Sequence, residues 1–290
     1  MRFRYTLRTL AAATLAPIRE SAPRMITILQ ISDAHLSPRS PLFQDNLAEI
    51  AAWAAASPPD LVIASGDLSL DGAGQAEDLV AAGLLRALPA PLLAIPGNHD
   101  VGSHPRTMPR QPVDAARLAR FRALVGADRW LRDLPGWRLV GLDTEIMGTG
   151  LPDEAEQAGF IAMATTGIGD RRLALFLHKP VFVTAPEEPV FDYWSVPPAA
   201  RSTLAPLLGH PALRLVASGH LHLHREEIHG AVRYAWAPAL SFVVAPEDQP
   251  GLPGERPAAR CCTGCTPTMW RPACSRRPGC GATGSTTSAT

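Results

Sequence analysis

The sequence predicts an α/β fold, and three observations support this prediction. Short apolar runs recur along the chain, and stretches with helical spacing of apolar residues lie between several of them. The chain of 290 residues is also long enough to bury a sizeable core. Because near-continuous apolar strands separated by helices are typical of a covered sheet, we expect helices on the outside of the strands.

The expected elements alternate along the chain. Strands are expected at Ile26–Ile31, Leu61–Ala64, Leu92–Ile95, Leu139–Leu142, Leu173–Leu177 and Leu213–Ala217. Helices are expected at Leu42–Ala56, Ala76–Leu88, Val113–Val125 and Pro198–Leu208, where apolar residues recur near helical spacing. Two later apolar runs, Val232–Ala237 and Leu240–Val244, are expected to form a hairpin-like pair that closes the domain.

Composition excludes several classes of protein. Hydrophobic residues make up 46% of the chain, which is typical of a globular protein, and the formal net charge is zero. Without a basic excess, nucleic acid is not an expected partner. No apolar run approaches the roughly 18–20 residues of a membrane span, so no membrane partner is expected either. The oligomeric state is left open, with a homodimer as one alternative.

Both ends of the chain differ in composition from a central domain at residues 25–250. Residues 1–24 are arginine-rich with a short Ala/Leu run, which fits either a start codon assigned too far upstream, with Met25 the true start, or a weak signal peptide. Residues 256–290 are rich in Cys, Gly, Thr and Pro, which favours a reading-frame shift or a disordered tail over a zinc finger. All five cysteines lie in this tail, so the body has no disulfide framework and a cytoplasmic location is expected.

Five segments place residues of metal-binding type directly after predicted strands. These residues are Asp33 and His35, then Asp67, then Asn98 with His99 and Asp100, then His178, and finally His220 and His222. The carboxyl ends of strands form the edge where ligand sites assemble in open α/β sheets, so residues far apart in sequence can meet there. Oxygen donors and imidazoles without sulfur suit a pair of transition-metal ions.

The spacing within these segments suggests how they reach the ions. Side chains two residues apart on an extended strand point to the same side, so Asp33 and His35 can reach one ion, and His220 with His222 repeats the pattern. Asp67 follows a glycine that allows a sharp turn, and its carboxylate can bridge two cations. Asn98 offers a neutral carbonyl oxygen.

Such a pair of ions is suited to the hydrolysis of phosphate esters. It lowers the pKa of a bound water, so that metal-bound hydroxide can attack phosphorus, and it stabilises the charge of an in-line displacement. His99 is expected to protonate the leaving alkoxide or to hydrogen-bond a phosphate oxygen. Asp100 is expected to orient His99.

The ordered set DAH, GD, GNHD, H and GHLH resembles the calcineurin-like metallophosphoesterase superfamily over about residues 26–245. Within it, the set is most similar to the bacterial 3′,5′-cyclic-nucleotide phosphodiesterases. The resemblance implies a four-layer α-β-β-α sandwich and two divalent or trivalent ions of iron, manganese or zinc. The implied ligands are Asp33, His35, Asp67 and His222 for the first ion, and Asp67, Asn98, His178 and His220 for the second.

Departures from sister families narrow the expected function. Purple acid phosphatases have a tyrosine where this chain has Leu70, lipid A pathway hydrolases have an arginine in place of His99, and protein phosphatases usually have Glu in place of Asp100. The resemblance therefore implies a metal-dependent phosphodiesterase for a small phosphodiester, with 3′,5′-cyclic AMP the leading candidate. The alternative enzymes are a phosphomonoesterase and a DNA exonuclease-type phosphoesterase. A further alternative is a non-catalytic scaffold protein of the same fold, which is less favoured because all seven candidate ligands are present.

Overall fold

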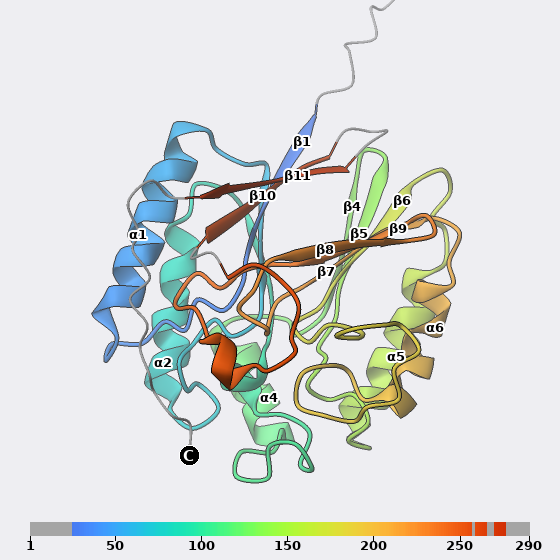
Figure 1. Cartoon of the computed structure of the whole chain (residues 1–290), viewed down its shortest axis with the longest axis horizontal. Helices are drawn as coiled ribbons and strands as arrows, with labels where there is room; N and C mark the ends of the chain where they lie inside the picture. Colours follow the sequence, from blue (N-terminus) through green and yellow to red (C-terminus); the bar gives the residue numbers. More distant parts are fainter. Residues whose placement is uncertain (1–24, 257–258, 266–269, 277–290) are drawn as a thin grey trace, which may run out of the picture.

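The computed structural model describes residues 25–256, 259–265 and 270–276. Two β-sheets pack face to face, and helices cover the outer face of each (Figure 1). This arrangement is the four-layer α-β-β-α sandwich that the resemblance implied. Within the described ranges, no helix is both long enough and apolar enough to cross a lipid bilayer.

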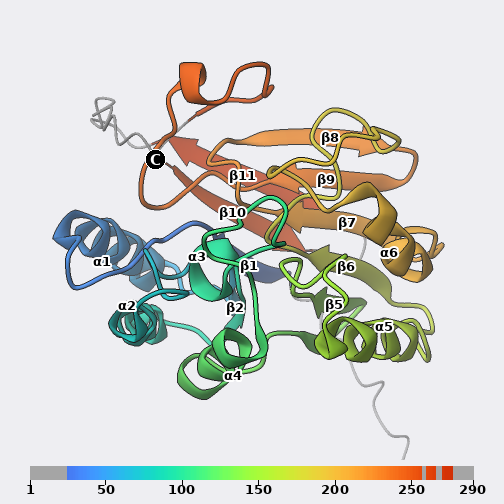
Figure 2. The ribbon, with the colours of Figure 1, turned by 90° about the horizontal axis from the view of Figure 1, so that it is seen from below.

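The first sheet has five strands in the order β11-β10-β1-β2-β3 (Figure 2). The strands are β1 (Ile26–Ile31), β2 (Leu61–Ser65), β3 (Leu92–Ile95), β10 (Ala259–Cys265) and β11 (Trp270–Arg276). β1, β2 and β3 are parallel, with Leu29 opposite Val62 and Val62 opposite Leu92. β10 runs antiparallel to β1 and pairs with β11 on its other side.

The second sheet has six strands in the order β4-β5-β6-β7-β9-β8. The strands are β4 (Trp130–Leu134), β5 (Trp137–Gly141), β6 (Arg172–Phe176), β7 (Leu213–Ser218), β8 (Arg225–His229) and β9 (Val232–Trp236). The central pairs β5–β6, β6–β7 and β7–β9 are parallel, and β4 and β8 close the edges as antiparallel strands. The carboxyl ends of β5, β6 and β7 therefore point in one direction.

Two sets of helices form the outer layers. One set is α1 (Pro41–Ala56), α2 (Ala76–Ala81), the 3-10 helix η1 (Ala82–Ala87) and α4 (Ala115–Leu124). The other is α5 (Pro152–Ala164), the 3-10 turn η2 (Pro198–Ala200) and α6 (Arg201–Leu208). Two short elements, α3 (Asn98–Val101) and η3 (Pro246–Asp248), lie in connecting segments.

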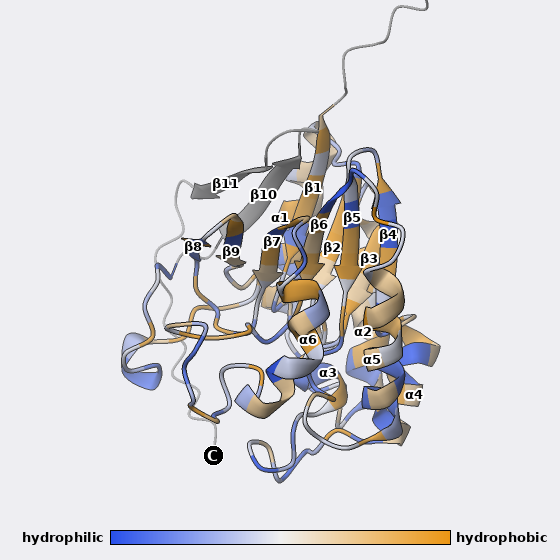
Figure 3. Ribbon diagram, turned by 90° about the vertical axis from the view of Figure 1, so that its right-hand side faces the viewer, coloured by the Kyte–Doolittle hydropathy of each residue, from blue (hydrophilic) through white to orange (hydrophobic). Residues whose placement is uncertain are grey.

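Alternating side chains on the strands build three apolar clusters. Leu29 of β1 packs with the α1, α2 and α4 layer, whereas Ile28, next to it in the chain, packs between the sheets. On β6, Leu175 faces α5 and α6, and Phe176 lies between the sheets. Both faces of the central strands are therefore buried, which explains why their sequences read as continuous apolar runs (Figure 3).

Most of the expected central elements are present, and several observed elements were not expected. The structure confirms β1, β3 and α1 within one residue of their expected ends. β4, β8 and α5 were not expected, because the first two are edge strands with polar, half-exposed residues and α5 carries few large apolar residues.

The expected hairpin at Val232–Ala237 and Leu240–Val244 is wrong. β9 pairs with β7 and β8 instead. The backbone N–H groups of Leu240 and Ser241 donate to the carbonyl oxygens of Ser32 and Asp33, at 2.9 and 3.1 Å. The second run therefore lies along the exit of β1, where it supports the first metal-binding segment.

The interpretations of residues 1–24 and 256–290 stay predictions. Residues 1–24 lie outside the described residues, as do 257–258, 266–269 and 277–290. The structure places β10 and β11, which belong to the 256–290 region, in the first sheet.

Candidate metal centre

The seven predicted ligands gather at one edge of the sandwich. Asp33 and His35 follow β1, Asp67 follows β2, Asn98 begins α3 after β3, His178 follows β6, and His220 and His222 follow β7. None of these side chains is more than 5% exposed. Burial of so many charged and polar groups is unfavourable unless they are compensated, so the cluster itself needs an explanation.

The backbone at five of these ligands is left-handed. Positive φ values occur at Asp33 (52°), His35 (45°), Asp67 (49°), His220 (68°) and His222 (53°), and no other non-glycine residue in the described part of the chain has one. This conformation costs about 1–3 kcal/mol per residue when the side chain is not glycine. The strained backbone positions of the described chain therefore coincide with five of the seven predicted ligands.

These angles correct the expected geometry of the paired ligands. Asp33 and His35 do not lie on an extended strand, because the chain turns at each of them. Their N–H groups donate to the carbonyl oxygens of Gly66 and Asp67, at 3.0 and 2.9 Å, so the two turning segments support each other. Both side chains still reach the same point, but through left-handed turns.

Glycines give the ligand segments room. Gly66 has a φ of +91°, and a Cβ at this position would lie 2.3 Å from His178 Nδ1. A Cβ at Gly219 would lie 1.7 Å from Ser32 Oγ. The sharp turn expected before Asp67 is therefore confirmed, and the close approach of neighbouring segments is a second reason for glycine.

A first group of ligands surrounds His35. Its Nε2 lies 3.2 Å from His222 Nε2 and 3.7 Å from Asp67 Oδ2. Asp33 Oδ1 lies 3.3 Å from His222 Nε2. Asp33, His35 and His222 can each direct one ligand atom to a common ion, since these atoms lie within 4.8 Å of one another.

A second group surrounds His178. Its Nε2 lies 3.3 Å from Asp67 Oδ2 and 3.1 Å from Asn98 Oδ1. Asp67, His178 and His220 form a further set whose ligand atoms lie within 4.8 Å. The same oxygen of Asp67 faces His35 in the first group and His178 in the second. The two groups match the two ligand sets that the resemblance implied, with Asp67 shared.

The residues fit two metal ions. Asp33 Oδ1 is buried and has no hydrogen-bond partner among the described residues. The far nitrogens of two imidazoles are held by backbone carbonyls: His178 Nδ1 lies 3.0 Å from Ser65 O, and His222 Nδ1 lies 2.9 Å from Phe242 O. Such contacts fix the tautomer so that Nε2 faces the centre, as in metal-bound histidines.

The electrostatics of the ligands reflect their crowding. Burial acts to raise the pKa of Asp33, but the positive charge of His222, whose Nε2 lies 3.3 Å from Asp33 Oδ1, lowers it to about 2. Burial also acts to raise the pKa of Asp67, but the positive charge of His178 lowers it well below its usual range. The pKa of His178 is raised to about 10, because the negative charge of Asp67 outweighs the burial that would lower it.

His99 lies beside the first group and is only half-buried. Its ring centroid is 4.6 Å from that of His35, and its backbone N–H donates to Asp67 Oδ1 at 2.8 Å. His99 Nδ1 lies 2.7 Å from the carbonyl oxygen of Leu70, so Nδ1 carries hydrogen and Nε2 is the nitrogen left for chemistry.

Asp100 does not orient His99 in the way the sequence suggested. Its carboxylate accepts four hydrogen bonds, from the N–H groups of Leu68, Ser69 and Gly97 and from the Ser69 hydroxyl, at 2.6–3.1 Å. Burial and the charge of Asp67 raise its pKa to about 6. Asp100 therefore ties the loop after β2 to the start of α3, and Leu70 holds the His99 ring.

Two further residues, half-buried Tyr193 and buried Lys179, make contacts beside the centre that the sequence analysis did not predict. Tyr193 Oη accepts a hydrogen bond from Asn98 Nδ2 at 2.7 Å. Lys179 Nζ lies 4.9 Å from the Tyr193 ring centroid. The position of Lys179 directly after His178 is the one signal that the sequence offers for these contacts.

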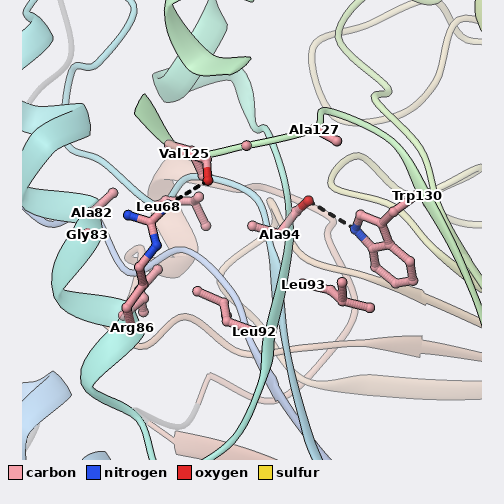
Figure 4. Close-up of a pocket in the computed structure, with 12 residues that line it drawn as sticks. Leu68, Ala82, Gly83, Arg86, Leu92, Leu93, Ala94, Val125, Ala127 and Trp130 are labelled. Carbon is pink, nitrogen blue, oxygen red and sulfur yellow. Dashed lines mark hydrogen bonds between the residues drawn. The ribbon is translucent and has the colours of Figure 1, made fainter. Parts of the chain in front are cut away.

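A separate cavity lies away from the ligands, between η1, β3 and the end of α4 (Figure 4). Its volume is about 160 Å³, and its walls are mostly apolar. Arg86 lines it but donates to the carbonyl oxygen of Val125 at 2.7 Å, and Trp130 Nε1 donates to Ala94 O at 2.9 Å. The polar groups of this cavity are engaged with the backbone, so it offers no chemistry comparable to that of the metal centre.

Comparisons with known proteins agree with this geometry. The family model described as calcineurin-like phosphoesterase matches residues 26–224. A Synechococcus protein described as a probable cyclic nucleotide phosphodiesterase is 25% identical over 245 residues, which cover 79% of this chain and 84% of that protein.

Two solved structures share the fold. A yellow lupin purple acid phosphatase superposes with a TM-score of 0.62 at 12% identity over 88% of this chain, which spans only 52% of the lupin protein. A dimetal phosphatase from Danio rerio superposes with a TM-score of 0.54 at 14% identity, covering 86% of this chain and 98% of that one. At these identities the likeness extends to the fold alone.

Metal binding is expected to release protons. An ion requires the lone pair of His178 Nε2, and below the pKa of about 10 the ring is protonated, so binding must displace a proton. The affinity for Mn²⁺ should therefore rise from pH 6 to pH 8, by about tenfold per pH unit for each proton released. Calorimetry in buffers of different ionisation enthalpy measures this release. His229→Ala, an exposed histidine, is the control, and an affinity independent of pH would contradict the expectation.

Proposed function

The chain belongs to the calcineurin-like phosphoesterase family, and from that premise we propose that it is a metal-dependent phosphodiesterase acting on a small phosphodiester. The observation that carries the proposal is the pair of ligand groups that share Asp67. Asp33, His35 and His222 would hold one ion, and Asn98, His178 and His220 the other, with Asp67 between them. When bound, the ions would supply a water of lowered pKa and positive charge for the phosphoryl oxygens.

His99 is the residue of this centre best placed to move a proton. Leu70 O fixes the ring, and the half-exposed side chain lies next to the buried ligands. With hydrogen on Nε2 as well as on Nδ1, the ring would donate a proton from Nε2 to the leaving alkoxide or a hydrogen bond to a phosphate oxygen. The backbone N–H of His99 also holds Asp67 Oδ1, so that Asp67 Oδ2 is left for the ions.

The proposed substrate is a small phosphodiester, and 3′,5′-cyclic AMP is the leading candidate. The Synechococcus relative described as a probable cyclic nucleotide phosphodiesterase supports this choice. Aromatic rings flank both groups of ligands: Phe242 lies 4.5 Å from His222, and Trp194 lies 6.0 Å from His220, between ring centroids. These half-buried rings offer surfaces on which a base could stack. Iron, manganese and zinc all suit the ligands.

The alternatives make different demands on the molecule. A phosphomonoesterase would use the same centre on a terminal phosphate. A DNA exonuclease-type enzyme would need a basic groove, whereas the net charge of this chain is zero. A non-catalytic scaffold has no need for strained, buried ligands, so the five left-handed residues favour an enzyme. A cytoplasmic location and a homodimer stay predictions.

Phosphodiesterase activity tests the proposal directly. With added Mn²⁺, the protein should hydrolyse bis(p-nitrophenyl) phosphate and 3′,5′-cyclic AMP faster than p-nitrophenyl phosphate. Asp67→Asn should lower kcat/KM by about 10³-fold or more, or about 4 kcal/mol of transition-state stabilisation. Asp71→Asn is a matched control, because Asp71 accepts hydrogen bonds from Gln75 and Gln111 outside the centre. If the natural chain were no more active than Asp67→Asn, the proposal would be refuted. Faster hydrolysis of p-nitrophenyl phosphate than of the two diesters would favour the phosphomonoesterase.

The role of His99 is tested by varying the leaving group. His99→Asn should lower kcat by about 10²–10⁴-fold for cyclic AMP, whose leaving alkoxide needs a proton. The loss should be much smaller for bis(p-nitrophenyl) phosphate, because p-nitrophenolate leaves without protonation. Equal losses on both substrates would show that His99 acts by binding phosphate or by holding the fold instead.

A further inference from the structure

The side chain of Tyr193 contacts the second ligand group and has no role in the chemistry described above. We propose that Tyr193 is a positioning residue for the second ion, holding Asn98 and His220 in the orientation that ligation requires. This inference rests on the proposed function, because it presupposes the dinuclear centre.

The hydroxyl of Tyr193 decides which end of the Asn98 amide faces the centre. Asn98 Nδ2 donates to Tyr193 Oη at 2.7 Å, and Asn98 Oδ1 lies 3.1 Å from His178 Nε2. A rotation of the amide by 180° would direct its N–H groups, which cannot ligate a cation, at the ion. Asn98 is 0% exposed, so bulk water cannot replace the hydroxyl as an acceptor. The hydroxyl therefore favours the orientation that ligates.

The same residue also orients His220. His220 Nε2 lies 3.0 Å from the backbone carbonyl oxygen of Tyr193, which leaves Nδ1 as the nitrogen available to an ion. The two rings also pack together, with centroids 4.8 Å apart. Tyr193 thus contacts two of the ligands implied for the second ion, and both contacts fix which atom of the ligand faces inward.

Neighbouring side chains hold Tyr193 in place. Lys179 Nζ lies 4.9 Å from its ring centroid, and the ring of Trp194 packs edge-on at 5.2 Å. Lys179 is itself buried; its ammonium donates to Ser103 Oγ at 2.7 Å and lies 3.5 Å from Glu145 Oε2. Because these contacts involve the ring rather than the hydroxyl, phenylalanine at position 193 should keep the same packing.

Calorimetric titration of the metal-free protein with Mn²⁺ tests the inference without any substrate. Two binding steps are expected for the natural chain. Tyr193→Phe should weaken one step by about 10–100-fold, the usual effect of losing a group that orients a ligand, and leave the other unchanged. Tyr234→Phe is the matched control, since Tyr234 packs near Phe182 and Trp236, away from the ligands. This control should bind as the natural chain does.

The Asn98→Asp background separates positioning from packing. A carboxylate has two equivalent oxygens, so its rotation cannot misplace a ligand, and Tyr193→Phe should have a much smaller effect there. An equal loss in both backgrounds, or equal weakening of both steps, would overturn the inference, as would a Tyr193→Phe protein that binds like the natural chain. A natural chain that binds fewer than two ions would instead contradict the dinuclear centre of the proposed function.

Discussion

The structure depends on one buried carboxylate, Asp67, which two groups of ligands share. Its Oδ2 lies between His35 and His178, and its Oδ1 is held by the N–H of His99. A buried carboxylate this close to imidazoles is stable only if positive charge compensates it. In the protein alone, His178 provides that charge, because its pKa is raised to about 10. Metal ions would provide it in the proposed enzyme.

This arrangement requires local backbone strain. Five ligands adopt left-handed backbone conformations, each unfavourable by about 1–3 kcal/mol. The surrounding contacts hold them: the turn at Asp33 donates to Gly66, and Asp100 joins the loop after β2 to α3 with four hydrogen bonds. The three apolar clusters fix the strands from which these turns emerge. Rigid sheets and short, cross-linked turns together position the ligands.

The sequence predicted those features that leave a pattern within a short segment of the chain. Each predicted ligand follows an apolar run, so the edge of the sheets and the ligand set could be predicted without coordinates. The left-handed turns could not be predicted. Asp33 and His35 are two residues apart in either case, so their spacing does not distinguish an extended strand from a turn. β4 and β8 lie at sheet edges and lack the continuous apolar pattern of the central strands. The role of Tyr193 depends on Asn98, 95 residues away, and no local pattern reports such a contact.

Anomalous X-ray scattering from crystals grown with Mn²⁺ tests the shared carboxylate most directly. Two peaks about 3.5–4 Å apart are expected, both within bonding distance of Asp67. One should lie among Asp33, His35 and His222, and the other among Asn98, His178 and His220. A single peak, or two peaks of which only one contacts Asp67, would contradict a centre built on that carboxylate.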